Sequence, residues 1–405
     1  MHKSSAFVLI ASVLGAIPTN AQNVDPLKPY TIKAANIEAT FIPYGARLTS
    51  LLVPDRSGKL QDVIFGYDDP KQYINDTLTD HTYTGSVLGP YANRIKNGTY
   101  ELDGVTYEVP KNDNGVQALH SGDLGYDQRN WTVTAQTEDS ITFTFHDTES
   151  EGFPGQVLTH ATYSVNSSYV EGNENPQVQL TTKTVSVSLN KRTPIMLSNH
   201  MYWNLNAWKV ATVVDDATLH LPLSGRFVKV DEVSAPTGEL GDVEADLDGS
   251  LDFRTAKPVS QDFNNTGPMC GGECNGYDHC FLVDRPEGSA DWSSSPETLT
   301  HILTVDSAKT GISMKVSANQ KAVQVYTCNW MGGNIAVKQS QIDRNIEDGD
   351  GGVEFIQKYG CIAIEPQGWI DGLNNPEWGQ LPYQTFSSHD GPAVNWATYV
   401  FGTNE

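Results

Sequence analysis

Glu365 ends the apolar run 361–364 and precedes a polar, turn-rich loop, residues 366–376. A carboxylate at the end of a buried strand loses hydration, so its pKa rises toward the range in which a general base works near neutral pH. A carboxylate that merely caps a strand end gives the same local pattern. Glu365 is therefore a candidate general base, and the choice between the two interpretations depends on polar residues elsewhere in the chain.

Two histidines occupy surroundings of the same kind. His120 ends the apolar step 116–119 and meets a flexible loop, while His200 lies in the aromatic and amide-rich segment 198–205. A single histidine of this type is usually a neutral core residue that bonds to backbone groups. Two of them together with Glu365 favour an assembled polar site in which protons are exchanged.

Two further side chains are suited to binding hydroxyl groups. Asn93 and Arg94 lie between apolar neighbours in residues 87–95. Carboxamide and guanidinium groups donate hydrogen bonds to sugar hydroxyls. A structural salt bridge is the alternative interpretation of Arg94.

Short alternating runs that predict β-strands fill the chain, whereas long helical periodicity is nearly absent. Residues 100–109 predict two strands around an Asp103-Gly104 turn. Further strands are predicted at 131–135, 140–146, 178–189, 217–221, 300–306, 311–318 and 322–327. Helical turns are expected at 69–75 and 243–247, and the polar stretches 286–296 and 339–352 are expected to be surface insertions between strands.

Five segments that carry the candidate site residues, taken in chain order, resemble those of one family, the aldose 1-epimerases or galactose mutarotases. The motifs that carry the resemblance are Gly89–Ile95, Leu119–Gly122, Asn199–Leu205, Tyr277–His279 and the strand glutamate Glu365. Together they span residues 89–376, most of the chain. The resemblance implies an all-β fold, a large antiparallel β-supersandwich that forms one domain over residues 22–405, with its site in an open cleft on one sheet.

The resemblance also implies roles for individual residues. Glu365 would be the general base that removes the proton of the anomeric hydroxyl, and His200 the general acid that protonates the ring oxygen. The residues implied to hold the sugar hydroxyls are Asn93, Arg94, His120, Asp278 and Gln324. One base and one acid suffice for this reaction, so neither a metal nor an organic cofactor is expected.

Two positions depart from the family pattern. Pro90 stands where many relatives have arginine, and Ser121 replaces the first glycine after His120. Both lie beside residues implied to contact the sugar, so they bear on sugar preference more than on the chemistry. Tyr202, Trp203 and Trp369 are expected either to stack on a sugar or to belong to the core.

The expected activity is the interconversion of the α and β anomers of a free monosaccharide of the galactose or glucose class. A sugar-binding protein without catalysis is one alternative on the same fold. A glycoside hydrolase is another, and it would need two carboxylates, for which Glu365 and Asp278 are candidates. A hexose-phosphate epimerase is disfavoured by the formal charge of −23, which also argues against nucleic acid or an anionic membrane as partner.

The first 21 residues predict a secretory signal peptide, with a weakly basic start, an apolar core at 6–17 and small residues at the cleavage site. The protein is therefore expected to be secreted, beginning near Gln22, and no later apolar run is long enough to span a bilayer. In a eukaryotic host the predicted N-glycosylation acceptors are Asn75, Asn97, Asn130, Asn166 and Asn264.

The five cysteines leave at least one unpaired within a single chain. Cys270 and Cys274 are expected to form a disulfide, because a Gly-rich loop joins them and can bring their Cβ atoms together. Cys280, Cys328 and Cys361 lie in apolar runs and are expected to be small core residues. The spacing does not resemble a paired Cys-x-x-Cys zinc site.

Overall fold

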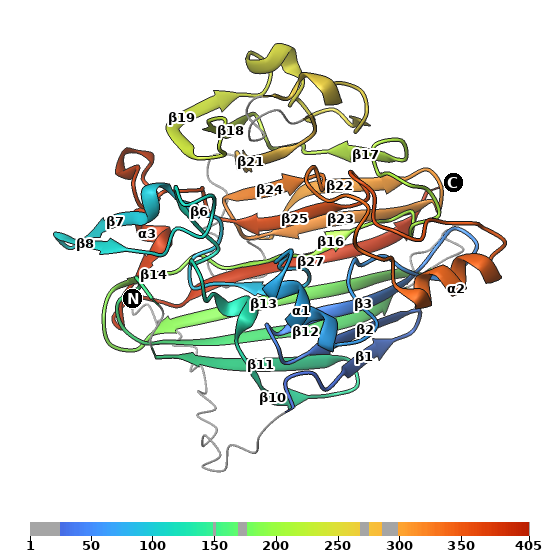
Figure 1. Cartoon of the computed structure of the whole chain (residues 1–405), viewed down its shortest axis with the longest axis horizontal. Helices are drawn as coiled ribbons and strands as arrows, with labels where there is room; N and C mark the ends of the chain where they lie inside the picture. The colour runs from blue at the N-terminus through green and yellow to red at the C-terminus, as the bar shows by residue number, and fades with distance from the viewer. Residues whose placement is uncertain (1–24, 149–150, 169–175, 268–274, 286–298, 405) are drawn as a thin grey trace, which may run out of the picture.

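The computed structural model describes residues 25–148, 151–168, 176–267, 275–285 and 299–404 (Figure 1). These residues form antiparallel sheets with few and short helices, so the predicted all-β fold is confirmed. The expected disulfide between Cys270 and Cys274, the cleavage site of the signal and the insertion 286–296 lie outside the described residues. None of the described helices is long and apolar enough to cross a membrane.

The largest sheet has nine strands, and its long members β11, β12, β13 and β27 lie side by side across the molecule in Figure 1. In spatial order the strands are β10 (Thr132–Gln136), β11 (Ser140–Asp147), β12 (Val157–Ser168), β13 (Gln177–Ser188), β27 (Ala393–Thr403), β23 (Ile312–Ala318), β22 (Thr300–Ser307), β17 (Ala217–His220) and β20 (Lys257–Pro258). Alternate residues of β12 and β13 are buried, as expected of a sheet with one face on the core.

A six-stranded sheet packs over part of the first one. Its strands, in spatial order, are β16 (Tyr202–Trp203), β25 (Ile362–Gln367), β24 (Ala322–Tyr326), β21 (Asp278–Leu282), β18 (Arg226–Val230) and β19 (Pro236–Asp242). Trp203 of β16 contacts Tyr399 of β27, with ring centroids 5.0 Å apart. Apolar residues of both sheets belong to one core cluster, so the two layers share a hydrophobic core.

Smaller sheets and helices complete the fold. A four-stranded sheet contains β1 (Tyr30–Ala34), β2 (Ile37–Ile42), β3 (Arg47–Pro54) and β4 (Leu60–Asp62). Two-stranded pairs are β5 (Val87–Leu88) with β15 (Ser198–Asn199), β6 (Arg94–Ile95) with β9 (Ala118–Leu119), β7 (Thr99–Leu102) with β8 (Val105–Glu108), and β14 (Thr193–Pro194) with β26 (Thr385–Phe386). The α-helices are α1 (Lys71–Leu78), α2 (Gln339–Glu347) and α3 (Leu381–Gln384), and 3-10 turns span Lys96–Gly98, Tyr126–Gln128, Asp246–Gly249, Phe263–Asn265 and Pro376–Trp378.

The predicted strands are confirmed to within two residues at each end, including the β7–β8 hairpin around Asp103 and Gly104. The two expected helical turns correspond to α1 and to the 3-10 turn at Asp246–Gly249. The stretch 339–352, expected to be a surface insertion between strands, lies between β24 and β25 and contains helix α2.

Candidate active site

The floor of the site is built by three neighbouring strands of the six-stranded sheet. Glu365 on β25 pairs with Gln324 on β24, and paired residues of antiparallel strands project from the same face. Asp278 on β21 pairs with Tyr326, two residues after Gln324, so its side chain also projects from that face. Strand register alone therefore brings the two carboxylates and the amide together.

Asn93 and His120 are held against each other by the short β6–β9 ladder, in which Arg94 pairs with Leu119. The His120 backbone N–H donates to the Asn93 carbonyl at 3.0 Å, and the Asn93 backbone N–H donates to His120 Nδ1, also at 3.0 Å. A neutral imidazole that accepts at Nδ1 carries its proton on Nε2. The fold therefore places a hydrogen-bond donor, His120 Nε2–H, at this side of the site.

His200 lies between β15 and β16 and is fixed by two backbone hydrogen bonds. Its N–H donates to the Ser86 carbonyl at 2.9 Å, and its carbonyl accepts from the Gly85 N–H at 2.7 Å. Gly85 has φ +73°, and a Cβ there would lie 2.0 Å from the Leu48 carbonyl oxygen, so this contact requires glycine. The result is a distance of 3.6 Å between His200 Nε2 and Glu365 Oε1.

All seven residues predicted for the site line one cavity of about 540 Å³. They are Asn93, Arg94, His120, His200, Asp278, Gln324 and Glu365. Apart from Arg94 and Asp278, which are partly exposed, these residues are buried. The cavity thus combines a histidine–glutamate pair with several hydrogen-bonding groups in a position shielded from bulk water.

Arg94 links the wall of the cavity to its floor. Its Nε donates to Asp113 Oδ2 at 2.9 Å, and its Nη2 lies 3.9 Å from Asp278 Oδ2. Gln324 Nε2 donates to the other oxygen of Asp278 at 2.6 Å. Arg94 therefore forms salt bridges and lines the cavity, so its two interpretations from the sequence are compatible.

Burial moves the pKa values of the central pair in opposite directions. It raises the pKa of Glu365 to about 8, with the nearby Asp278 carboxylate acting in the same sense and Arg94 against it. It lowers the pKa of His200 to about 3. The pKa of His120 also falls well below its ordinary value, through burial and then through the neighbouring His200 and Arg94. Near neutral pH the proton of the central pair therefore resides on Glu365, because burial disfavours both charged forms.

His120, His200 and Glu365 each offer one metal-ligating atom, and these atoms lie within 4.8 Å of one another. The donor set fits a metal poorly. His120 Nδ1 already accepts a hydrogen bond from the Asn93 N–H, so Nε2 bears the proton and has no free lone pair. Metal binding there would require this hydrogen bond to break.

Several residues of the cavity wall were not predicted from the sequence. Among them are His81, Tyr83, Asp113, Tyr326 and Trp330. Strand alternation identifies Tyr326, which follows Gln324 by two positions in a predicted strand. No comparable signal exists for His81 and Tyr83, whose rings stack at 3.9 Å in a segment without strand periodicity. Of the aromatic residues expected to stack or pack, Tyr202 lines the cavity, whereas Trp203 and Trp369 belong to core clusters.

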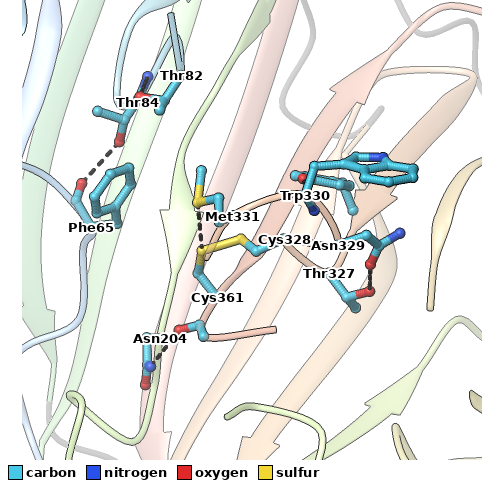
Figure 2. Close-up of a disulfide and its surroundings, with 12 residues drawn as sticks. Phe65, Thr82, Thr84, Asn204, Thr327, Cys328, Asn329, Trp330, Met331 and Cys361 are labelled. Atoms are coloured by element: carbon cyan, nitrogen blue, oxygen red, sulfur yellow. Dashed lines mark hydrogen bonds between the residues drawn. A yellow bond between two sulfur atoms is a disulfide. The ribbon is translucent and has the colours of Figure 1, made fainter. Parts of the chain in front are cut away.

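Cys328 and Cys361, expected to be small core residues, are also bonded to each other, a pairing that the sequence does not predict. They form a disulfide with Cα atoms 5.6 Å apart, shown in Figure 2. Tyr326, the last residue of β24, pairs with Ala363 on β25. Cys328 lies two residues after Tyr326 and Cys361 two residues before Ala363, so the two cysteines face each other just beyond the paired ends of these strands. Both are fully buried, as expected, and Cys280 is buried and free.

Pro90 and Ser121, which depart from the family pattern, lie outside the residues that line the cavity. Ser121 Oγ accepts from the Tyr91 N–H and donates to the Tyr91 carbonyl, both at 2.9 Å. Ser121 has φ +80°, a conformation that favours glycine. Its hydroxyl therefore joins two loops behind His120.

The family model described as Aldose 1-epimerase matches residues 28–386. The chain is 55% identical to a probable aldose 1-epimerase of Arthroderma benhamiae, over 94% of this chain and 88% of that relative. It is 28% identical to the galactose mutarotase of Sus scrofa, over 91% and 92% of the two chains. A solved structure of a GalM/aldose epimerase homologue from C. elegans has a TM-score of 0.74 and 25% identity, covering 93% of this chain and 99% of that one.

Proposed function

This chain belongs to the aldose 1-epimerase family, and we propose that it interconverts the α and β anomers of free hexoses outside the cell. The observation that carries the proposal is the buried pair of His200 Nε2 and Glu365 Oε1, 3.6 Å apart, in a cavity lined by hydroxyl-binding side chains. A hemiacetal opens when one group takes a proton from O1 and another gives one to the ring oxygen, which is work for such a pair.

In the proposed mechanism Glu365 takes the O1 proton, the electron pair of that O–H bond forms the aldehyde C=O, and the bond from C1 to the ring oxygen breaks. The ring oxygen receives its proton from His200 and becomes a hydroxyl. Rotation about C1–C2 and the reverse proton transfers close the ring with either configuration. The fixed donors Arg94, His120 Nε2–H and Asn93, with the acceptor Asp278, hold the remaining hydroxyls while this occurs.

The pair needs one proton in total, and the proton must lie on His200 when O1 is attacked. In the free site it lies on Glu365, whose pKa is about 8, and not on His200, whose pKa is about 3. Transfer of this proton from Glu365 to His200, across 3.6 Å, leaves the total charge of the pair unchanged. The balance between the pair with the proton on Glu365 and the pair with the proton on His200 therefore does not depend on pH. Hydroxyls that donate to the carboxylate favour the productive arrangement once sugar binds.

We expect kcat/KM to be level between about pH 3 and about pH 8. Above this range the pair loses its shared proton and no acid remains; below it the pair gains a second proton and no base remains. Ordinary pKa values of about 4.3 and 6.5 would give a much narrower optimum. Measurement of kcat/KM over a pH series decides between the shifted and the ordinary pKa values. An alkaline decline near pH 6.5 would show that burial does not lower the pKa of His200.

Polarimetry of freshly dissolved α-galactose and α-glucose tests the proposed activity directly. The protein should accelerate the approach to anomeric equilibrium, and chelators should leave the rate unchanged. Methyl and aryl glycosides should be inert, because they lack the O1 proton that Glu365 must take. Release of aglycone would support the hydrolase instead, and sugar binding with no acceleration over buffer would support a binding protein.

The charge of the cavity argues against a hexose phosphate as substrate. Arg94 is the one arginine or lysine among the described residues that line it, and it already faces Asp113 and Asp278. Asp80 and Glu365 add two further carboxyl groups to the wall. A phosphate dianion would meet more negative than positive side chains there.

Two observations support the proposed secretion. All five asparagines of the predicted glycosylation sites are exposed, as an occupied site must be. The Cys328–Cys361 disulfide is of a kind that persists in oxidising compartments and is rare in the cytosol of mesophiles.

We expect protein collected from the medium of a eukaryotic host to begin near Gln22 and to lose mass on enzymatic deglycosylation. Intact mass spectrometry before and after treatment, with N-terminal sequencing, measures both properties. A protein that retains Met1 and carries no glycan would contradict the prediction.

A further inference from the structure

We propose that the imidazole of His81 is a positioning group that keeps the acid His200 in its catalytic orientation. It acts through the ring of Tyr83, which contacts both histidines, and it is itself held by Asp127. This inference rests on the proposed function, because the orientation of His200 matters to a rate only if His200 delivers a proton to the sugar.

The imidazole of His200 is held by the rings around it and not by hydrogen bonds. Its Nδ1 has no hydrogen-bond partner among the described residues, and its Nε2 lies 3.6 Å from Glu365 Oε1, beyond hydrogen-bond distance. The rings packed against it belong to Tyr202, His120 and Tyr83, with centroids 4.8, 5.2 and 5.8 Å away. Displacement of a catalytic group by about 1 Å can lower a rate about 10²-fold, so these rings affect catalysis.

The Tyr83 ring is held in turn by His81. The two rings stack with centroids 3.9 Å apart and an interplanar angle of 24°. Tyr83 also meets the edge of His120 at 4.7 Å, and its hydroxyl accepts one long hydrogen bond, from Asn112 Nδ2 at 3.4 Å. Stacking therefore does most to place the Tyr83 ring, and His81 supplies the closest ring contact within the described part of the chain.

Asp127 holds His81 from inside the protein. Its Oδ2 lies 2.9 Å from His81 Nε2, and its side chain is 1% exposed. Its Oδ1 has no hydrogen-bond partner in the described ranges, so separation from His81 would leave a buried carboxylate unpaired. The Asp127 carbonyl accepts from Arg47 Nη2 at 3.0 Å, and the same buried arginine donates to the carbonyl of Thr84, the residue after Tyr83.

The backbone of the segment that carries the two rings is strained. His81 has φ +45° and Tyr83 has φ +57°, in the left-handed region that side chains with a Cβ rarely adopt. Such conformations persist where the surrounding structure requires them, and they are concentrated at active sites. The strain is therefore consistent with a segment whose fold serves the position of its rings.

The test measures kcat and KM for anomer exchange of galactose in variants of His81. His81→Ala should lower kcat about tenfold and leave KM nearly unchanged, because His200 loses its support. His81→Phe keeps the stacked ring and should restore most of kcat. His81→Gln keeps a donor to Asp127 without the ring and should stay as slow as His81→Ala. His389→Ala, at an exposed position outside the cavity, is the control and should change neither constant.

A double-mutant cycle examines whether Asp127 acts through His81. Asp127→Ala should lower kcat as much as His81→Ala does, and the double variant should lose no more than either single variant. Losses that multiply in the double variant would contradict the inferred pair. If Asp127→Ala does not fold, the contrast between His81→Phe and His81→Gln decides alone, because these two variants separate the ring from the hydrogen bond.

An unchanged kcat in His81→Ala, or a rise in KM alone, would overturn the inference and leave the proposed function intact. A wild-type protein that exchanges no anomers would overturn the proposed function. In that case the imidazole NMR resonances of His200, in protein labelled at histidine, still report on its surroundings. They should move in His81→Ala and not in His389→Ala, and resonances that stay in place would overturn the inference.

Discussion

Replacing Glu365 by glutamine should lower kcat for anomer exchange by at least about 10²-fold while the protein stays folded. The amide keeps the shape of the carboxyl group but has no basic oxygen to take the O1 proton, and a positioned proton-transfer group is worth about 10² to 10⁴ in rate. Glu239→Gln, the same change at an exposed position outside the cavity, should leave kcat unaltered. An active Glu365→Gln protein would remove Glu365 from the mechanism.

The same variant should be at least as stable as the wild type, and the comparison separates a catalytic role from a structural one. The folded pKa of Glu365, about 8, lies above its unfolded value. Between the two values the folded state binds more protons than the unfolded state, so wild-type stability falls as pH rises through this window. Glutamine does not titrate, so denaturation at pH 8 should favour the variant. A strand end that needed its carboxylate for stability would give the opposite result.

Much of the fold can be predicted from the sequence because strand alternation is a local property. In the first half of β13, a predicted strand, the apolar residues Val178 and Leu180 are the buried ones, so the hydrophobic pattern shows the alternation directly. In its second half, Thr and Ser residues occupy the buried positions and Val185 and Val187 are partly exposed.

Helix α2 could not be predicted in this way. Its two buried residues, Gln341 and Asn345, are amides that donate to backbone carbonyls of Asp62, Ile64 and Ala207. Its buried face is therefore polar, and Ile346 is exposed.

The residues of the site also fall into two groups, those that the sequence identifies and those that only the folded structure brings together. Glu365 and Gln324 lie on recognisable strands, and His120 and His200 stand in motifs that resemble those of a known family. The Cys328–Cys361 pairing depends instead on the register between β24 and β25, which spacing along the chain does not reveal. His81 reaches the cavity through tertiary contacts, with its Nε2 2.9 Å from Asp127 Oδ2. Such contacts require the folded structure.

Two histidines of the cavity could supply the acid, and the structure distinguishes them. His120 Nδ1 accepts from the Asn93 N–H, which fixes its tautomer and makes it a hydrogen-bond donor that does not exchange protons easily. His200 Nδ1 has no hydrogen-bond partner among the described residues, and its Nε2 faces Glu365 at 3.6 Å. His200 can therefore gain and lose a proton without breaking a structural hydrogen bond, which favours it as the acid.

We accordingly expect His200→Asn to lower kcat by at least about 10²-fold, because asparagine fills similar space but cannot deliver a proton to the ring oxygen. His120→Asn should act mainly on KM, since it removes a donor to the sugar and leaves the proton-transfer pair in place. His146→Asn, on the exposed side of β11, is the matched control and should change neither constant. Steady-state kinetics of the three variants, with circular dichroism to verify folding, measures these effects. A rise in KM alone for His200→Asn, with loss of kcat in His120→Asn, would exchange the roles of the two histidines.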